Sequence, residues 1–289
     1  MLEIKNVWKT FNKGTVNEKQ ALCGVNLTLN DGDFCTVIGG NGAGKSTTLN
    51  AIAGVWPVDC GQILIDGKDI SALPEHKRAP YLGRVFQDPM TGTVADMEII
   101  ENLAIAARRG KKRGLSWGVK ADERFRYRQM LAEFDLGLEN RMSSKVGLLS
   151  GGQRQAITLL MATIKKPKLL LLDEHTAALD PKTAAKVLEL SDKIIAENNL
   201  TALDPISTSK IEELAMELKK DYTIVMVTHN MHDAITHGNR LIMMSDGKII
   251  LDISGEVKKN LTVEHLLEMF EKASGSKLEN DRMLLSKDK

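Results

Sequence analysis

The sequence has few cysteines and few aromatic residues, and it has no excess of either charge. Of its 289 residues, 3 are cysteines and 4% are aromatic, while 39 basic residues stand against 38 acidic ones. Cys23, Cys35 and Cys60 show no C-x-x-C spacing, which predicts reduced thiols in a cytoplasmic protein and gives no support to a metal site. The balanced charge gives no reason to expect nucleic acid as a partner.

Long apolar runs are also lacking. None approaches the roughly 20 residues that a membrane-spanning helix needs, and the acid in the first five residues argues against a signal peptide. We therefore expect any role at a membrane to pass through a partner. At 43% hydrophobic, the chain can bury the core of one large α/β domain or two modest ones.

One glycine-rich stretch, residues 39–47, organises the rest of the sequence. Its spacing is G-x-x-x-x-G-K-[ST], the pattern of a phosphate-binding loop. A β-branched apolar run at 34–38 precedes it and a helical pattern at 48–53 follows it, which is the context that the motif requires. A glycine-rich turn that matches by accident would not explain that context. The predicted phosphate-binding residues are Gly39, Gly40, Asn41, Gly42, Ala43, Gly44, Lys45, Ser46 and Thr47.

Polyphosphate chemistry explains this composition. Amides that wrap a phosphate leave no room for side chains on the inner face of the loop, so glycine recurs. The following helix points its positive end at the phosphates. Lys45 can reach the β- and γ-phosphates, and the Ser46 hydroxyl can ligate Mg²⁺.

Strand and helix patterns surround the loop. Alternation of apolar and polar residues predicts strands at 2–7 and 21–29, joined by a polar loop, and hairpins at 61–70 and 240–252. Further strands are predicted at 82–86, 168–173 and 223–228. Helical spacing at 94–107 and 121–134 predicts an inserted helical region, and a last helix at 263–272 precedes a polar tail that we expect to be mobile.

Two acids, Asp173 and Glu174, end the apolar run that begins at residue 168. Carboxylates at the end of a buried parallel strand lie where α/β sheets bind ligands. In P-loop enzymes the first acid helps to hold Mg²⁺, and Glu174 could polarise the attacking water. An ordinary acidic turn is the alternative for this segment taken alone.

Three more residues are candidates by position. Gln87 and His229 follow predicted strands and are expected at the same sheet edge as Glu174, although a lone histidine is usually structural. Phe11, between the first two strands, is either a loop anchor or an aromatic that stacks on a base.

A generic P-loop fold does not need the pentapeptide Leu149-Ser150-Gly151-Gly152-Gln153. This pentapeptide resembles the signature of ATP-binding cassette (ABC) ATPases. The resemblance covers about residues 1–255, with each family motif in order. It implies adenine stacking by Phe11, Mg²⁺ ligation by Ser46, Gln87 and Asp173, and catalysis by Lys45, Gln87, Glu174 and His229. It also implies that Asp180 is the D-loop residue and that Ser150, Gly151, Gly152 and Gln153 complete the phosphate site of a second, head-to-tail subunit.

The implied fold is α/β, a P-loop NTPase with a RecA-like core and a mainly parallel sheet, an antiparallel β subdomain and an inserted helical subdomain. The ABC ATPase domain would span 1–255, with its core at 1–91 and 167–255 and the helical subdomain at about 92–166. A C-terminal helix and tail would occupy 256–289.

The implied function is Mg²⁺-dependent ATP hydrolysis that powers solute transport by an importer. The implied partners are a second copy of the chain, transmembrane permease subunits and an extracytoplasmic solute-binding protein, without nucleic acid. The chain would be cytoplasmic and peripheral on the inner face of the cell membrane. Residues 203–231 resemble phosphate-importer ATPases, whereas 85–90 and 106–118 resemble an uptake family for amino acids or related solutes, so no single solute is predicted.

Two departures from the family pattern leave alternatives open. His175 replaces the proline that usually follows the catalytic glutamate, which loosens that turn. The sequence Ala178-Leu-Asp-Pro181 recurs at 202–205, so one capped helix is repeated and the segment 202–220 is additional. The chain is then either an ABC ATPase that tolerates the repeat or an ATP-binding module with impaired hydrolysis. A soluble ABC ATPase without a transport role is the third possibility.

Overall fold

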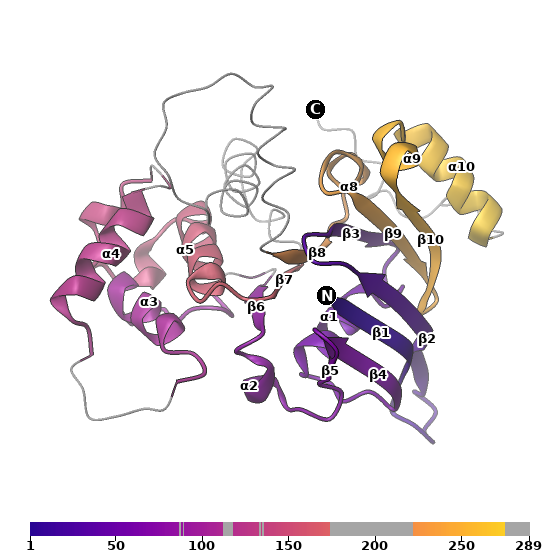
Figure 1. Ribbon diagram of the computed structural model, residues 1–289, viewed down its shortest axis with the longest axis horizontal. Coiled ribbons are helices and arrows are strands. Elements are labelled where there is room, and N and C mark those ends of the chain that lie inside the picture. The colour runs from indigo at the N-terminus through magenta and orange to yellow at the C-terminus, as the bar shows by residue number, and fades with distance from the viewer. Residues whose placement is uncertain are drawn as a thin grey trace. The chain divides into compact units, whose positions relative to one another are not determined.

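The computed structural model describes residues 1–86, 88, 90–111, 118–132, 134, 136–173 and 222–274. The chain divides into two compact units, a first unit of Met1–Arg78 with Tyr222–Lys289 and a second unit of Ala79–Asp221 (Figure 1). The predicted helical repeat at 178–220, Glu174, Asp180 and the polar tail all lie outside the described residues.

Two sheets build the first unit. One is antiparallel, in the order β2-β1-β4-β5, and in the other β3 lies between β8 and β9, parallel to both, with β10 antiparallel to β9. The strands of the antiparallel sheet are β1 (Leu2–Phe11), β2 (Lys19–Leu29), β4 (Cys60–Ile65) and β5 (Lys68–Asp69). The others are β3 (Phe34–Gly39), β8 (Thr223–Val227), β9 (Arg240–Ser245) and β10 (Lys248–Ser254).

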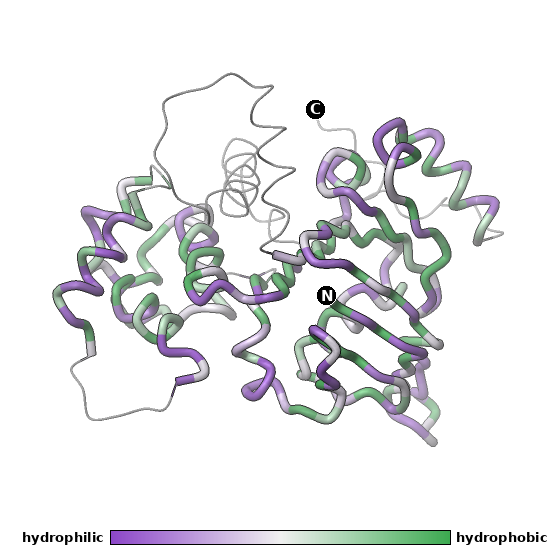
Figure 2. Tube along the Cα trace, in the orientation of Figure 1, coloured by the Kyte–Doolittle hydropathy of each residue, from purple (hydrophilic) through white to green (hydrophobic). Residues whose placement is uncertain are grey.

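The side-chain pattern of these strands follows their surroundings. All residues of β3 and β8 are buried, as expected for parallel strands inside a sheet. Hydrophobic and hydrophilic residues alternate at 2–5 in β1 and at 25–29 in β2, and Figure 2 colours the chain by this property. Both Asp-Gly turns, 66–67 and 246–247, have positive φ at both residues, the conformation of a type I′ hairpin turn.

Five helices are described in the first unit: α1 (Lys45–Ala53), α2 (Glu75–Arg78), α8 (Met231–Thr236), α9 (Gly255–Lys259) and α10 (Val263–Ser274). The C-terminal helix α10 buries Leu266 and Phe270 in a cluster with residues of α8, β9 and β10. In Figure 1 it lies beside these elements.

A buried arginine closes the carboxyl end of α1. Arg78 is 1% exposed, and burial lowers the pKa of its guanidinium. Its Nη1 donates to the carbonyls of Ala51 and Ile52 in α1 at 2.7 and 2.8 Å. Its Nε and Nη2 donate to the carbonyls of Leu73 and Ser71 at 2.7 and 2.9 Å. Arg78 therefore ties the last turn of α1 to the segment that follows β5.

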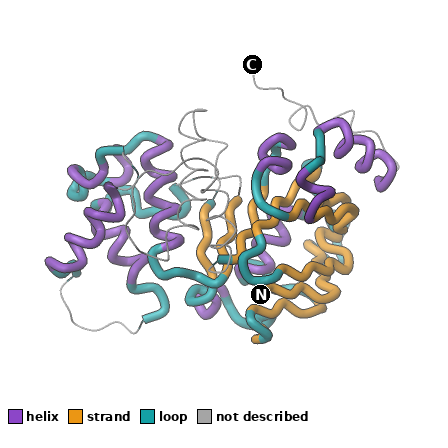
Figure 3. Tube along the Cα trace, turned by 45° about the horizontal axis from the view of Figure 1, so that its top comes forward, coloured by secondary structure: helices purple, strands orange, loops and turns teal. Residues whose placement is uncertain are grey.

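The second unit combines two parallel strands with helices, as Figure 3 shows by colour. Its elements are β6 (Leu82–Val85), α3 (Ile99–Ala107), α4 (Ala121–Ala132), the 3₁₀ turns Leu138–Asn140 and Val146–Leu148, α5 (Gly151–Thr163) and β7 (Leu169–Asp173). Among the described residues, no helix combines the length and the apolar character that crossing a bilayer requires.

The α/β class, the antiparallel part and the helical region are confirmed, and two local predictions were wrong. Phe11 is the last residue of β1 rather than part of a loop, because the ladder with β2 continues to the pair Phe11 and Lys19. The helix predicted from residue 94 begins at Ile99, because Glu98 and Glu101 form a capping box that starts it there. The predicted boundaries of the ATPase domain stay a prediction.

The four hydrogen bonds of the Arg78 guanidinium, which we call the arginine clamp, generate a stability prediction. Arg78→Met removes four hydrogen bonds and leaves buried carbonyls at the end of α1 without this donor, so it should destabilise the protein by about 3 kcal/mol. Urea denaturation measures the change. The neighbouring exposed Lys77→Met is the matched control and should stay within about 0.5 kcal/mol of the unaltered protein. Equal urea-denaturation midpoints for Arg78→Met and Lys77→Met would contradict a stabilising role of the arginine clamp.

Candidate functional site

The phosphate loop begins where β3 ends, at a position that only glycine fits. Gly39 has φ +147 and pairs with Met244 of β9. A Cβ on Gly39 would lie 2.2 Å from the Met244 carbonyl oxygen, which is far inside van der Waals contact. The neighbouring strand therefore sets the direction in which the loop leaves the sheet.

The outer side of the loop rests on backbone from two other elements. The Gly247 N–H donates to the Ala43 carbonyl at 3.0 Å, and the Cys23 N–H of β2 donates to the Gly247 carbonyl at 2.9 Å. A Cβ on Gly44 would lie 2.7 Å from the Ala21 carbonyl oxygen. The β9–β10 turn thus braces the loop, a role that we did not predict, because the sequence indicates the turn but not which strand lies next to β3.

Lys45 places a positive charge over the start of the loop. Its side chain is 5% exposed, and its Nζ donates to the carbonyls of Gly39 and Gly40 at 2.7 and 3.1 Å. Gly44, the N-cap of α1, is left-handed and offers no side-chain cap. An uncapped helix N-terminus and a lysine ammonium on the same loop both favour an anion there. Asn41, Gly42 and Ser46 on the same loop are exposed.

His229 lies at the same edge of the sheet as the loop. It follows β8, which is in parallel register with β3 through the pair Val37 and Val227. The Thr228 N–H donates to the Val37 carbonyl at 3.1 Å, and Asn230 caps α8 directly after the histidine. The strand register therefore places His229 and the start of the phosphate loop at the same edge of the sheet in the first unit.

Phe11 ends β1 beside another aromatic residue. Its ring centroid lies 4.8 Å from that of Trp56 in an edge-on arrangement, and Lys9 Nζ lies 5.5 Å from the Phe11 ring centre. The Trp56 contact was not predicted, because the two residues are brought together by the pairing of β1 with β4.

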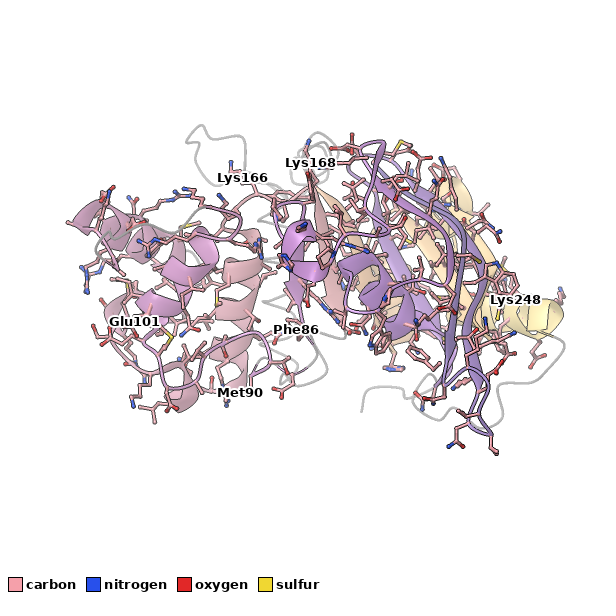
Figure 4. All side chains as sticks on the ribbon, turned by 90° about the horizontal axis from the view of Figure 1, so that it is seen from below. Phe86, Met90, Glu101, Lys166, Lys168 and Lys248 are labelled. Carbon is pink, nitrogen blue, oxygen red and sulfur yellow. The ribbon has the colours of Figure 1, made fainter. Side chains whose placement is uncertain are left out.

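Asp173 ends β7 in the second unit. Its carboxylate is 3.8 Å from the Arg84 guanidinium of β6, and Arg84 in turn lies over the ring of Phe86, with 4.4 Å between guanidinium carbon and ring centre. Figure 4 labels Phe86, with Met90 further along the chain. Gln87 lies outside the described residues, as do Glu174 and Asp180.

The signature residues form the start of α5. Ser150 Oγ accepts from the Gln153 N–H, and the Gln153 side chain accepts from the Ser150 N–H, both at 3.3 Å. This is a capping box, and the S-x-x-Q spacing could have predicted it. Gly151 and Gly152 therefore occupy the first turn of α5, where no Cβ covers the amides.

The chain is similar to known ATP-binding proteins. The sequence model of the ABC transporter family matches residues 22–177. The chain is 41% identical over 273 residues to a tyrosine transport ATP-binding protein of Clostridioides difficile (strain R20291), covering 94% of this chain and 100% of that protein. It is 34% identical over 252 residues to the spermidine/putrescine import ATP-binding protein PotA of Haemophilus ducreyi, covering 87% of this chain but 57% of PotA.

Solved structures show the same fold. The dimeric post-hydrolysis state of the ATP-binding cassette MJ0796, bound to ADP and Pi, is 29% identical with a TM-score of 0.70, covering 88% of this chain and 98% of that one. The ADP conformation of MJ1267, an ATP-binding cassette of an ABC transporter, is 27% identical with a TM-score of 0.69, covering 93% and 98%.

The glycine at the end of β3 generates a prediction. Gly39→Ala forces a clash with the Met244 carbonyl, so it should destabilise the protein by at least about 3 kcal/mol. Gly67→Ala is the matched control, because Gly67 also has positive φ but nothing lies within 4 Å of its Cβ position. That variant should cost only about 1 kcal/mol. Thermal unfolding compares the two, and equal losses would show that the close approach to β9 has no effect of its own.

Proposed function

The chain belongs to the ABC transporter family as an importer-like subunit that binds and hydrolyses ATP, and on this premise we propose which residues hold the nucleotide. The observation that carries the proposal is the phosphate loop itself. The Lys45 ammonium is held by the carbonyls of Gly39 and Gly40, next to the N-terminus of α1, which lacks a side-chain cap. A triphosphate requires such a combination of buried cation and helix amides.

The loop residues also fit a bound Mg²⁺. Mg²⁺ prefers oxygen ligands, usually one or two from the protein with phosphate oxygens as the others. The exposed Ser46 hydroxyl on the loop is a ligand of that kind, and the resemblance implies Asp173 and Gln87 as the others. When bound, the ion would neutralise charge on the phosphate oxygens.

The remaining residues act on the γ-phosphate or on the base in the proposal. Lys45 and His229 stabilise the negative charge that develops there, and Glu174 orients or deprotonates the attacking water. Phe11 stacks on adenine. The roles of Gln87, Glu174 and Asp180 rest on the resemblance alone.

We further propose that the chain works as a head-to-tail homodimer. ABC ATPase subunits dimerise and act with membrane permease subunits, and MJ0796 has been solved as a dimer. The start of α5, with Ser150, Gly151, Gly152 and Gln153, offers helix amides of the kind that bind phosphate, so it would complete the site of the second copy. The chain would lie at the cytoplasmic face of the membrane, with an extracytoplasmic protein delivering the solute.

The transported solute that we propose is an aromatic amino acid. A relative that matches along its whole length is named for tyrosine transport, whereas the polyamine importer ATPase of Haemophilus ducreyi extends well beyond this chain. In cells of the source organism that lack this chain, uptake of labelled tyrosine should fall and should return with the unaltered chain. Loss of spermidine uptake with unchanged tyrosine uptake would contradict this choice.

A single substitution tests ATP hydrolysis at the loop. Lys45→Met removes the cation that contacts the β- and γ-phosphates, so Mg²⁺-dependent hydrolysis should fall by at least about 100-fold. Phosphate release by the purified protein measures the rate, and circular dichroism checks that the variant is folded. Equal hydrolysis rates for a folded Lys45→Met variant and the unaltered protein would contradict the assignment of the phosphate loop as the ATP site.

A further inference from the structure

Lys19 lies directly beside the residue assigned to adenine stacking. It is the first residue of β2, and its partner in the antiparallel ladder is Phe11, the last residue of β1. Directly opposite residues of an antiparallel pair have their side chains on the same face of the sheet. The Lys19 side chain therefore starts next to the Phe11 ring.

The other end of the same side chain reaches the phosphate loop. Lys19 Nζ lies 3.2 Å from the position that a Cβ on Gly42 would occupy. Gly42 is exposed and has φ +79, so this ammonium lies against the solvent side of the loop. Lys45, by contrast, is buried and donates to the carbonyls at the start of the loop. The two lysines thus approach the loop at different places.

The charge of Lys19 is not engaged within the described residues. Its ammonium takes part in no hydrogen bond or ion pair there. Lys9, the other lysine beside Phe11, pairs with Asp59 at 3.3 Å. An exposed ammonium that has no partner among the described residues and lies beside a phosphate-binding loop is available to an anionic ligand.

Resting on the proposed function, we propose that Lys19 is a nucleotide-binding residue. Its ammonium contacts the ribose end of the polyphosphate, because Lys19 pairs with Phe11 in the ladder and its Nζ lies beside Gly42 of the loop. ATP and ADP both carry the α-phosphate, so this contact strengthens the binding of both nucleotides. A contact made equally in the ground state and the transition state lowers KM and leaves kcat unchanged.

The test measures the affinities of Lys19→Met for ATP, ADP and adenosine by calorimetry in the presence of Mg²⁺. Loss of one charge-assisted hydrogen bond should weaken ATP and ADP binding by about tenfold each, while adenosine binding stays unchanged. The KM for ATP should rise by the same factor, with kcat within about twofold, and Lys19→Arg should restore most of the affinity. Lys13→Met, an exposed lysine in the same β1–β2 connection, is the matched control and should stay within about twofold.

Three results would overturn the assignment of Lys19. They are unchanged ATP affinity in Lys19→Met, an equal loss of adenosine affinity, or an equal loss in Lys13→Met. Failure of the unaltered protein to bind ATP would overturn the proposed function together with this inference. Normal binding by both the unaltered protein and Lys19→Met would overturn the inference alone.

Discussion

The close approach of Gly39 to the Met244 carbonyl of β9 is the constraint on which the rest of the site depends. It excludes any side chain where the chain leaves β3, and it directs the loop across the edge of the sheet. Backbone from the 246–247 turn and from β2 then supports the outer side of the loop. The bracing bond from the Gly247 N–H uses the Ala43 carbonyl, so this support holds the loop without occupying an amide that could bind phosphate.

The two ends of α1 have different surroundings, and each is compatible with the helix dipole. At the carboxyl end, the buried Arg78 guanidinium donates hydrogen bonds to the carbonyls of Ala51 and Ile52. At the amino end, Gly44 provides no side-chain cap, so the first turn is available to a ligand. A cation at the negative end and an anion at the positive end both stabilise a helix. The clamp at Arg78 therefore helps to hold the phosphate-facing end of α1 in a defined place.

Features that depend on short stretches of sequence could be predicted, and features that depend on long-range register could not. The loop spacing, the apolar run of β3 and the Asp-Gly turn at 246–247 each carry a local signal. The brace from Gly247, the Trp56 contact of Phe11 and the approach of Lys19 to Gly42 require the order and register of strands far apart in the chain. The capping box at Ser150 and Gln153 also has a local signal, the S-x-x-Q spacing. Predictions for 174–221 stay predictions, because those residues are not described.

The most direct test of the account compares steady-state ATP hydrolysis by the purified protein with that by Glu174→Gln, while size is followed with and without nucleotide. The account predicts Mg²⁺-dependent turnover by the unaltered protein. For the variant it predicts a rate lower by about 10² to 10⁴, and an ATP-bound dimer that persists because hydrolysis no longer separates the subunits. If both proteins bind ATP and neither hydrolyses it, the chain is an ATP-binding module whose site is impaired, and the hydrolytic mechanism is contradicted.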